Sequence, residues 1–215
     1  MAICEHIIGG RGGQGEWDGE GAGGGRDVRE GEERGRREEL GGGMRGESKK
    51  GFCVRSFGTG NQVKLPGPAL DKPNIYDFNT TYDEMYKDLH RKDPELYTQN
   101  GILHMLDRNR RIKPRPERFQ ACKDKFDIIV TCEERVYDQV IEDFESRVKE
   151  DMQPVHIINI DIQDNHEEAT LGAFLILDLV TMLQDSEDLD NEIDEILQDF
   201  EGKSNRSVLH TLGFY

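Results

Sequence analysis

The sequence predicts an α/β protein built on a doubly wound, mostly parallel sheet. Two runs, "FDIIVT" and "PVHIINI", are continuously apolar and rich in β-branched residues, which is typical of strands buried on both faces. A segment with helical periodicity follows each run, and alternation of strands with helices favours a parallel sheet with helices on both sides. In such folds, ligands bind outside the carboxyl ends of the strands. The loops after these two runs are therefore the first places to look for a site.

The composition divides the chain at about residue 51. Residues 1–51 hold 17 of the 24 glycines and few apolar side chains, so we expect a disordered segment that cannot offset the entropy of ordering. Charge counts give 9 Lys/Arg against 11 Asp/Glu in that segment, and 19 against 33 in residues 52–215, a net −14. The acidic domain, residues 52–215, therefore repels polyanions, which argues against direct binding of nucleic acid.

Cysteine usage and hydropathy limit the cellular compartments in which we expect the protein. The four cysteines show no CxxC spacing, which argues against a disulfide framework and against a zinc site. The longest apolar run, "AFLIL", is far shorter than the ~20 residues of a membrane span. The N-terminus shows no basic region followed by an apolar one, as a secretory signal would. We expect the cytosol or the nucleus, with no membrane contact and no metal.

The first half of the domain alternates strand, loop and helix. "FCVRSF", from Phe52, predicts a strand, and the proline-punctuated "VKLPGPALDKP" predicts a loop. "TTYDEMYKDLHRKD" predicts a helix in which Thr80 and Asp83 resemble a capping box. "PELYTQNGILHMLDRNRR" predicts a helix that breaks at Gly101 and then resumes.

The second half supplies the helices that follow the buried strands. In "EERVYDQVIEDFESRVK", Val136, Val140 and Phe144 recur at helical spacing, so one face of this helix is apolar. "HEEATLGAFLILDLVTML" is apolar nearly all round and predicts a central helix. "SEDLDNEIDEILQDFEGK" predicts an acidic amphipathic helix, and "SVLHTLGFY" predicts a last strand.

The loop after "PVHIINI" carries the densest group of polar side chains. Asp161, Asp164 and His166 lie between a buried strand and a buried helix. One hypothesis is a general acid, because partial burial raises the pKa of a carboxyl group and lets it donate a proton. A metal site is a second hypothesis, although no third spaced ligand is apparent. The alternative is helix capping, in which Asp164 or Asn165 accepts backbone N–H bonds.

The cysteines do not provide a phosphatase nucleophile. Cys132 follows a predicted strand and precedes a helix, where a thiol pKa can be lowered. A cysteine phosphatase needs an arginine six residues after its thiolate, so that phosphate meets both backbone N–H groups and a guanidinium. The residues six places after the four cysteines are Gly10, Thr59, Ile128 and Asp138. We therefore interpret all four cysteines as structural or incidental.

A basic segment interrupts the acidic domain. "RNRRIKPRPER", residues 108–118, holds six Lys/Arg. It could attract a phosphorylated or a nucleic-acid partner, because a cluster of cations raises the local concentration of anions. Its prolines equally favour an exposed, solvated loop.

Seven motifs together resemble one family. "VRSFGTG", "VKLPGPA", "DKPNIYDF", "YTQNGILHMLDRN", "RIKPRPERFQ", "CEERVYDQV" and "DIQDNHEEATLGAF" resemble the RNA polymerase II C-terminal-domain phosphatases of the small, cis-proline-selective type. The resemblance covers about residues 51–215. It implies a flavodoxin-like fold similar to low-molecular-weight tyrosine phosphatases, and no cofactor. It also implies removal of phosphate from serine at the fifth, and also the seventh, position of the polymerase heptad repeat through a phosphocysteine.

The same resemblance implies partners and residue roles. The partners are the polymerase phosphopeptide and symplekin, in transcription and mRNA 3′-end processing, in the nucleus with the cytoplasm as an alternative. Asp164 is similar to the general acid of the family, with Asp161 and His166 as supporting residues. The residues similar to the wall that receives the proline after the phosphoserine are Lys64, Leu65, Pro66 and Met105.

The chain departs from the family at its beginning. The family has a strand, a C-x5-R-S loop and a helix before "GF-VRSFGTG", and this chain has none of them there. The resemblance therefore supplies neither a nucleophilic cysteine nor a phosphate-binding arginine, and we predict that this chain hydrolyses no phosphate. Two explanations stay open. One is a faulty or alternative N-terminus of a gene whose main product is active, and the other is a non-catalytic isoform that binds symplekin or the polymerase tail.

The missing strand also predicts a defect in the sheet. In a flavodoxin-like order 2-1-3-4 the first strand is central. Without it, "FCVRSF" and "FDIIVT" lose their shared neighbour, and each unpaired backbone group costs about 1–3 kcal/mol. Insertion of "MAICEHII" into the gap is the less favoured alternative.

Overall fold

The structure, a computed structural model, describes most of the domain and a short part of the N-terminal segment. The described residues are 7–11, 53–69, 71–149, 151–163 and 165–215. Within the segment predicted to be disordered, Ile7–Arg11 form strand β1, which differs from that expectation. The rest of residues 1–51, together with Phe52, lies outside the described residues, so the boundary at residue 51 stays a prediction.

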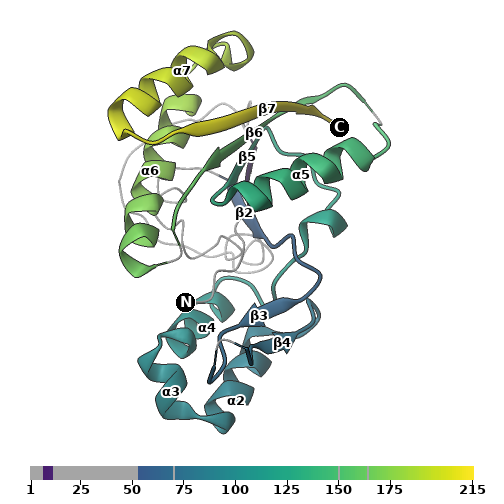
Figure 1. The fold of residues 1–215 in the computed structure, drawn as a ribbon. Helices are drawn as coiled ribbons and strands as arrows, with labels where there is room; N and C mark the ends of the chain where they lie inside the picture. Colours follow the sequence, from purple (N-terminus) through teal and green to yellow (C-terminus); the bar gives the residue numbers. More distant parts are fainter. Residues whose placement is uncertain (1–6, 12–52, 70, 150, 164) are drawn as a thin grey trace, which may run out of the picture.

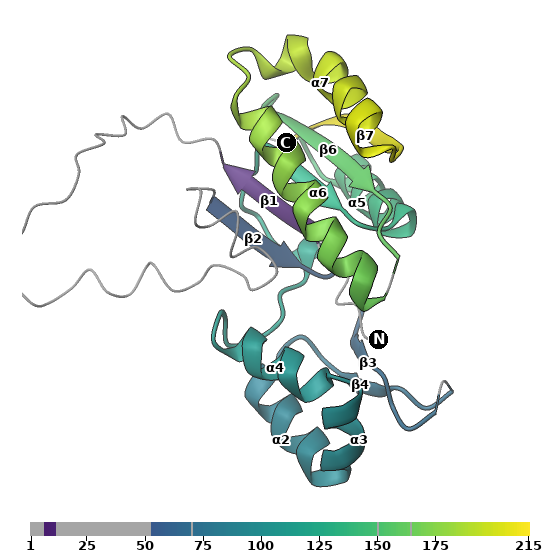
Figure 2. The ribbon, with the colours of Figure 1, turned by 90° about the vertical axis from the view of Figure 1, so that its left-hand side faces the viewer.

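Five strands form the main sheet, in the order β2-β1-β5-β6-β7 (Figure 1). They are β1 (Ile7–Arg11), β2 (Cys53–Phe57), β5 (Ile128–Thr131), β6 (Pro154–Ile160) and β7 (Val208–Phe214). β5 and β6 pair in parallel, β7 is antiparallel to β6, and β1 is antiparallel to both β2 and β5. Three strands, β2, β5 and β6, therefore run in one direction, and Figure 2 shows β1 pointing the opposite way to β2. The α/β class is confirmed, with a sheet that mixes parallel and antiparallel pairs.

Strand β1 takes the central place that we expected to be empty. Ile7 lies opposite Phe57 on one side and Thr131 on the other. The expectation that "FCVRSF" and "FDIIVT" lack a shared neighbour is therefore wrong. The physical reason is that an empty place would leave backbone groups of two strands unpaired, at about 1–3 kcal/mol each. That penalty outweighs the poor strand propensity of the two glycines in β1.

Helices cover both faces of the sheet and enclose two separate cores. The helices of this lobe are α5 (Glu134–Ser146), α6 (His166–Gln184) and α7 (Leu189–Ser204). Ile129 and Ile157 pack with α5, whereas Val130 and Ile158 pack with α6 and α7. Successive residues of a strand point to opposite faces, so the two cores lie on opposite sides of the sheet. The predicted doubly wound arrangement is confirmed.

Helix α6 is covered on one side and open on another. Ile176, Leu179 and Leu183 are buried against the sheet, whereas Leu171 is 46% and Phe174 is 63% exposed. The prediction of a central helix is therefore wrong for the face that carries Leu171 and Phe174. Across the described part of the chain, no helix combines the length and the apolar character needed to cross a bilayer.

A second lobe lies between β2 and β5 in the sequence (Figure 1). Its elements are β3 (Val63–Leu65), β4 (Asn74–Tyr76), α2 (Tyr82–Lys92), α3 (Pro94–Gln99) and α4 (Ile102–Arg110). The predicted loop "VKLPGPALDKP" begins as strand β3, which pairs antiparallel with β4. The predicted helix break is confirmed at Gly101, whose φ of +79° is a left-handed conformation that favours glycine.

The first helix of this lobe begins with a capping box. Thr81 Oγ1 accepts the N–H of Glu84 at 3.2 Å, and Glu84 Oε2 accepts the N–H of Thr81 at 2.8 Å. The prediction of Thr80 with Asp83 was one residue early. The reason is that Thr80 belongs to the preceding turn, where its N–H donates to Asp77 Oδ1 at 2.9 Å.

Candidate functional site

Two buried polar side chains lie where β5 and β6 end. Thr131 and Asn159 are 0% and 2% exposed, and Thr131 Oγ1 donates to Asn159 Oδ1 at 2.8 Å. Asn159 Nδ2 donates in turn to Asp161 Oδ1 at 3.0 Å. The same Asp161 oxygen accepts the backbone N–H of Glu134 at 3.1 Å. Asp161 therefore connects the end of β6 to the start of α5, where the helix dipole favours a carboxylate.

This geometry limits what Asp161 can do. One of its oxygens accepts two hydrogen bonds, one from a buried amide and one from a backbone N–H. In this arrangement the Asp161 carboxyl group acts as a hydrogen-bond acceptor for both groups. The arrangement fits the supporting role that the resemblance implies, and that role stays a prediction.

The loop that leads to α6 is fixed at both ends. The N–H of Ile162 donates to the carbonyl of Cys132 at 3.0 Å, which joins the loops after β6 and β5. At the other end, Asn165 Oδ1 accepts the N–H of Glu168 at 2.8 Å and caps α6. Helix capping is therefore performed by Asn165, one of the two residues that could have provided it.

Two of the predicted site residues keep the status of predictions. Asp164 lies outside the described residues, so its role as general acid stays a prediction. His166 is the first residue of α6, and its supporting role is likewise untested. The described residues of this loop give no support to the hypothesis of a metal site. Within the described residues, no group of three His, Cys, Asp or Glu side chains is placed to hold a metal ion.

The residues predicted to receive a proline belong to the second lobe. Lys64 and Leu65 are on β3, Pro66 follows that strand, and Met105 is on α4. Leu65 is 1% exposed, and Met105 packs against the core that contains it. Lys64 is exposed, whereas Pro66 and Met105 are half-buried. The structure thus brings Leu65 and Met105 together, with Leu65 supporting the surface from beneath.

A buried amide fixes the backbone beside Pro66. Asn74 Nδ2 donates to the carbonyl of Pro66 at 3.0 Å and to the hydroxyl of Tyr97 at 2.9 Å. Lys92 Nζ donates to Asn74 Oδ1 at 3.0 Å. Because both ends of this amide are bonded, it holds the carbonyl of Pro66 in one direction. The sequence interpretation missed Asn74, although a polar residue beside an apolar one in the motif "DKPNIYDF" could have pointed to it.

The turn after Pro66 requires a glycine. A Cβ atom added to Gly67 would lie 1.7 Å from the carbonyl oxygen of Lys72, so two backbone segments approach each other there.

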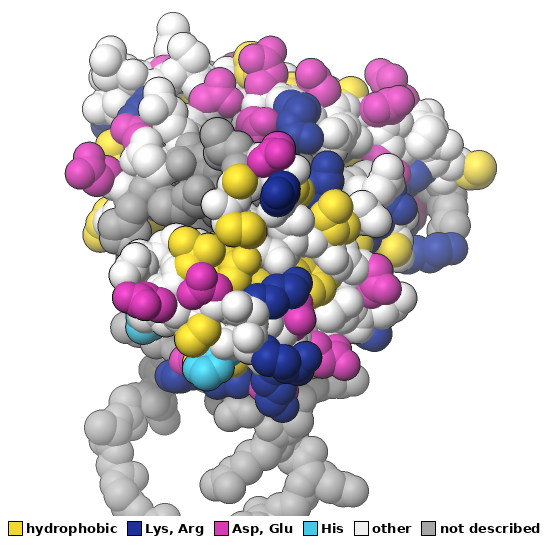
Figure 3. Space-filling view, turned by 60° about the horizontal axis from the view of Figure 1, so that its bottom comes forward, with side chains coloured by type: hydrophobic (Ala, Val, Ile, Leu, Met, Phe, Trp, Pro, Cys, Tyr) yellow, Lys and Arg dark blue, Asp and Glu magenta, His cyan; other side chains and the backbone are white. Residues whose placement is uncertain are grey.

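Figure 3 views the molecule from the side of this lobe and shows apolar side chains lying between basic and acidic groups. The lobe therefore presents a mixed surface around a rigid turn.

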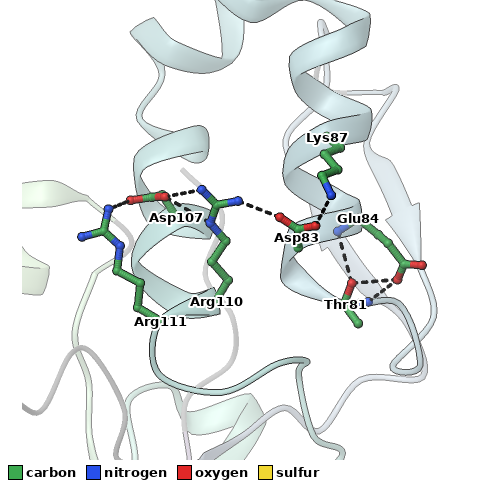
Figure 4. A network of polar contacts seen from close by, with 7 residues as sticks. All are labelled: Thr81, Asp83, Glu84, Lys87, Asp107, Arg110 and Arg111. Carbon is green, nitrogen blue, oxygen red and sulfur yellow. Dashed lines mark hydrogen bonds and ion pairs between the residues drawn. The ribbon is translucent and has the colours of Figure 1, made fainter. Parts of the chain in front are cut away.

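Three of the six cations of the basic segment, Arg110, Arg111 and Lys113, form ion pairs within the protein. Arg110 donates to Asp107 Oδ1 at 3.1 and 2.6 Å and to Asp83 Oδ1 at 2.7 Å, which joins α4 to α2 (Figure 4). The bonds from Arg110 lower the pKa of Asp107. Lys113 Nζ pairs with Glu117 at 3.1 Å. These contacts favour a structural role for the segment, and they leave fewer of its cations for a phosphorylated partner.

Cys122, one of the two cysteines with described side chains, does not resemble an activated nucleophile. Cys122 and Cys132 are each half-buried. Burial raises the pKa of Cys122, which keeps it protonated and weakly nucleophilic at neutral pH. Cys4 lies outside the described residues, and Cys53 begins β2.

Comparison with solved structures identifies close relatives of this fold. Ssu72 from Drosophila melanogaster, a serine phosphatase of the RNA polymerase II C-terminal domain, is 59% identical with a TM-score of 0.76, covering 78% of this chain and 88% of its own. The same organism's Ssu72 with symplekin, bound to a cis peptidomimetic phosphoserine-5 peptide of that domain, is 56% identical with a TM-score of 0.77, covering 80% and 90%.

Sequence comparison agrees with the structural one. The SSU72 phosphatases of Bos taurus and Homo sapiens, named for the C-terminal domain of RNA polymerase II, are each 74% identical over 168 residues, which is 78% of this chain and 87% of theirs. A human SSU72-like protein 4 is 59% identical over 167 residues. The profile of the Ssu72-like protein family matches residues 45–215, and the chain belongs to that family.

Proposed function

We propose that this chain is a binding module of the polymerase-tail phosphatase family. It binds phosphoserine heptad repeats of the RNA polymerase II C-terminal domain and does not remove the phosphate. The observation that carries the proposal is the 74% identity over 168 residues to phosphatases named for that substrate. The matched region spans both the second lobe and the loops at the carboxyl ends of β5 and β6.

The proposed absence of turnover rests on the spacing of cysteine and arginine in the sequence. No cysteine of the chain is followed six residues later by an arginine. Removing the nucleophile of a covalent mechanism typically lowers the rate on the order of 10⁶-fold. Asp164, in the role of general acid, would protonate a leaving group and could not replace the missing thiolate.

The proposed peptide site uses the residues that the resemblance assigns, and the packing of the second lobe supports it. Lys64, Pro66 and Met105 form the wall against which the proline after the phosphoserine packs, and Leu65 supports that wall from the core. Asp161 and His166 have the supporting roles that the resemblance implies, beside Asp164 as the general acid. Because Asn74 fixes the carbonyl of Pro66, the wall is preorganised, which reduces the entropy lost on binding.

Binding of symplekin is the second candidate function. The Drosophila Ssu72 that is solved with symplekin shares 56% identity with this chain, and the alignment covers 90% of that protein. A chain that binds symplekin without turnover would act in the nucleus, in mRNA 3′-end processing, as the non-catalytic isoform. The competing explanation is an alternative N-terminus of a gene whose main product carries the C-x5-R-S loop.

Peptide binding is tested with a fluorescently labelled heptad peptide and the full chain. We expect the peptide phosphorylated at the fifth-position serine to bind more tightly than its unphosphorylated form, as measured by anisotropy. Met105→Ala should weaken binding, whereas the control Met152→Ala, at a residue 69% exposed outside the second lobe, should leave it unchanged. Equal binding of both peptides, or equal effects of both variants, would refute the peptide site.

Symplekin binding is tested separately by size-exclusion chromatography of the purified chain with purified symplekin. Co-elution of the two proteins without phosphate release supports the non-catalytic isoform. Separate elution under conditions where the SSU72 phosphatase co-elutes with symplekin would refute this second candidate.

A further inference from the structure

The basic segment ends in Arg118, whose guanidinium binds the loop that leads from β2 to β3. Its Nε donates to the carbonyl of Gly60 at 3.1 Å, and its Nη2 donates to Asn61 Oδ1 at 2.7 Å. A planar guanidinium holds its donors in fixed directions, so the two bonds together orient this loop. Arg118 therefore connects two parts of the chain that are distant in the sequence.

The chain that enters the second lobe and the chain that leaves it run side by side. Gly58 forms a parallel bridge with Arg118, and its N–H donates to the carbonyl of Glu117 at 2.9 Å. The carbonyl groups of residues 58–60 all accept hydrogen bonds from the departing chain. The donors, at 2.9, 2.9 and 3.1 Å, are the N–H of Phe119, Nε2 of Gln120 and Nε of Arg118. The entering chain is thus held at three successive residues.

These bonds tie the entering loop to the core of the first lobe. Phe119 is 1% exposed and packs in the core beneath α5, where its ring meets that of Phe57 edge-on at 6.0 Å between centroids. The entering loop, by contrast, contains Gly58 and Gly60, and glycine adopts more backbone conformations than other residues. Without its bonds to the departing chain, this loop would leave the start of β3 poorly placed.

β3 begins shortly after this loop and carries part of the proposed wall. Lys64 lies on β3, and Pro66 follows the strand. The loop after β6, which contains Asp164, belongs to the first lobe, so a bound peptide has to reach both lobes. Each residue of an extended peptide spans at most about 3.3–3.6 Å, so the separation of the two lobes decides which peptide residue meets the wall.

We propose that Arg118 is a positioning residue for this peptide site. It acts through Gly60 and Asn61, fixes the separation between the wall and the loop after β6, and so selects a proline directly after the phosphoserine. This role rests on the proposed function, because the position of the wall matters for selection only if a peptide binds there. The basic segment then contributes to the site by placing β3.

The test compares two labelled heptad peptides that share the phosphoserine and have either proline or alanine as the next residue. The unmodified full chain should bind the proline peptide more tightly, as measured by fluorescence anisotropy. Arg118→Gln should lower this preference about threefold to tenfold, as the loss of hydrogen bonds of ordinary strength would. Arg115→Gln removes the same charge from an exposed side chain of the same segment and should leave the preference unchanged. Equal weakening of both peptides in Arg118→Gln would indicate a merely structural role and overturn the proposal.

Amide hydrogen exchange tests the same role without a peptide. Exchange across residues 61–65 should become faster in Arg118→Gln and stay unchanged in Arg115→Gln. Asn61→Ala removes one acceptor and should have a smaller effect in the same direction, and it replaces Arg118→Gln if that variant does not fold. Unchanged exchange in these variants overturns the positioning role, whether or not a peptide binds. Failure of the unmodified chain to bind either peptide, with exchange changed as expected, refutes the proposed function and leaves Arg118 as the residue that positions β3.

Discussion

The buried pair at the ends of β5 and β6 gives the sharpest prediction for stability. Asn159→Ala removes an acceptor for Thr131 and a donor to Asp161. The neutral bond contributes about 1 kcal/mol and the bond to a charged group about 1.5–3 kcal/mol. Thr131 Oγ1 keeps a weak alternative acceptor, the carbonyl of Ile158 at 3.4 Å. The free energy lost with the bond from Thr131 to Asn159 therefore lies at the low end of its range. We therefore expect a decrease of about 2–4 kcal/mol in the free energy of unfolding.

A double-mutant cycle separates the two bonds. Thr131→Val removes one hydroxyl and should lower the free energy of unfolding by about 1 kcal/mol, because it leaves Asn159 Oδ1 without this donor. In the double variant the two losses should fall short of their sum by roughly 1 kcal/mol, since each single variant already breaks the shared bond. Urea denaturation followed by far-UV circular dichroism measures all four proteins. A change below ~0.5 kcal/mol for Asn159→Ala, or full additivity, would refute this description of the pair.

Three further predictions rest on buried or half-buried side chains. Leu65→Ala, at a residue 1% exposed, should lower the free energy of unfolding by about 2–5 kcal/mol in urea denaturation, with an unchanged value counting against a core role. Burial raises the pKa of Tyr215 to about 12, from an ordinary 10, so the unfolded chain loses this proton first and the stability should fall as the pH rises from 10 to 12. Tyr215→Phe, which also removes the acceptor for the N–H of Phe126, should reduce that slope in thermal melts, while Tyr76 and Tyr137, whose pKa values are also raised by burial, keep part of it. Burial and the neighbouring His156 lower the pKa of His210 below its ordinary 6.5. The unfolded chain therefore binds this proton first, and the free energy of unfolding should decrease as the pH falls below 6.5. The variant His210→Gln should remove this effect.

The sequence predicted the elements whose pattern decides their structure. The β-branched runs of β5 and β6 and the helical spacing of Val136, Val140 and Phe144 are strong local signals, and the structure has them as predicted. β1 could not be predicted in this way, because Gly9–Gly10 has poor strand propensity and its pairing depends on two strands that are distant in the sequence. The exposed face of α6 could not be predicted for a related reason. The sequence pattern shows which residues of the helix are apolar, but not which other elements cover them.

The candidate site was partly visible in the sequence. Asp161 stood out because it follows a buried strand, but its partners Thr131 and Asn159 were passed over. The signal that could have found them is a polar residue near the end of each continuously apolar run, since a buried polar group needs a partner. Asn165 as the cap of α6 was one of two residues equally compatible with the sequence. The choice depends on backbone conformation, which composition does not reveal.

Phosphate release from a phosphoserine heptad peptide tests the central claim most directly. The purified full chain should release no phosphate from a peptide phosphorylated at the fifth-position serine, nor hydrolyse p-nitrophenyl phosphate, while it still binds the peptide. The reason is that no cysteine of the chain has an arginine at the spacing that a phosphate loop requires. Vanadate-sensitive turnover that disappears when one of the four cysteines is replaced by serine would contradict the account.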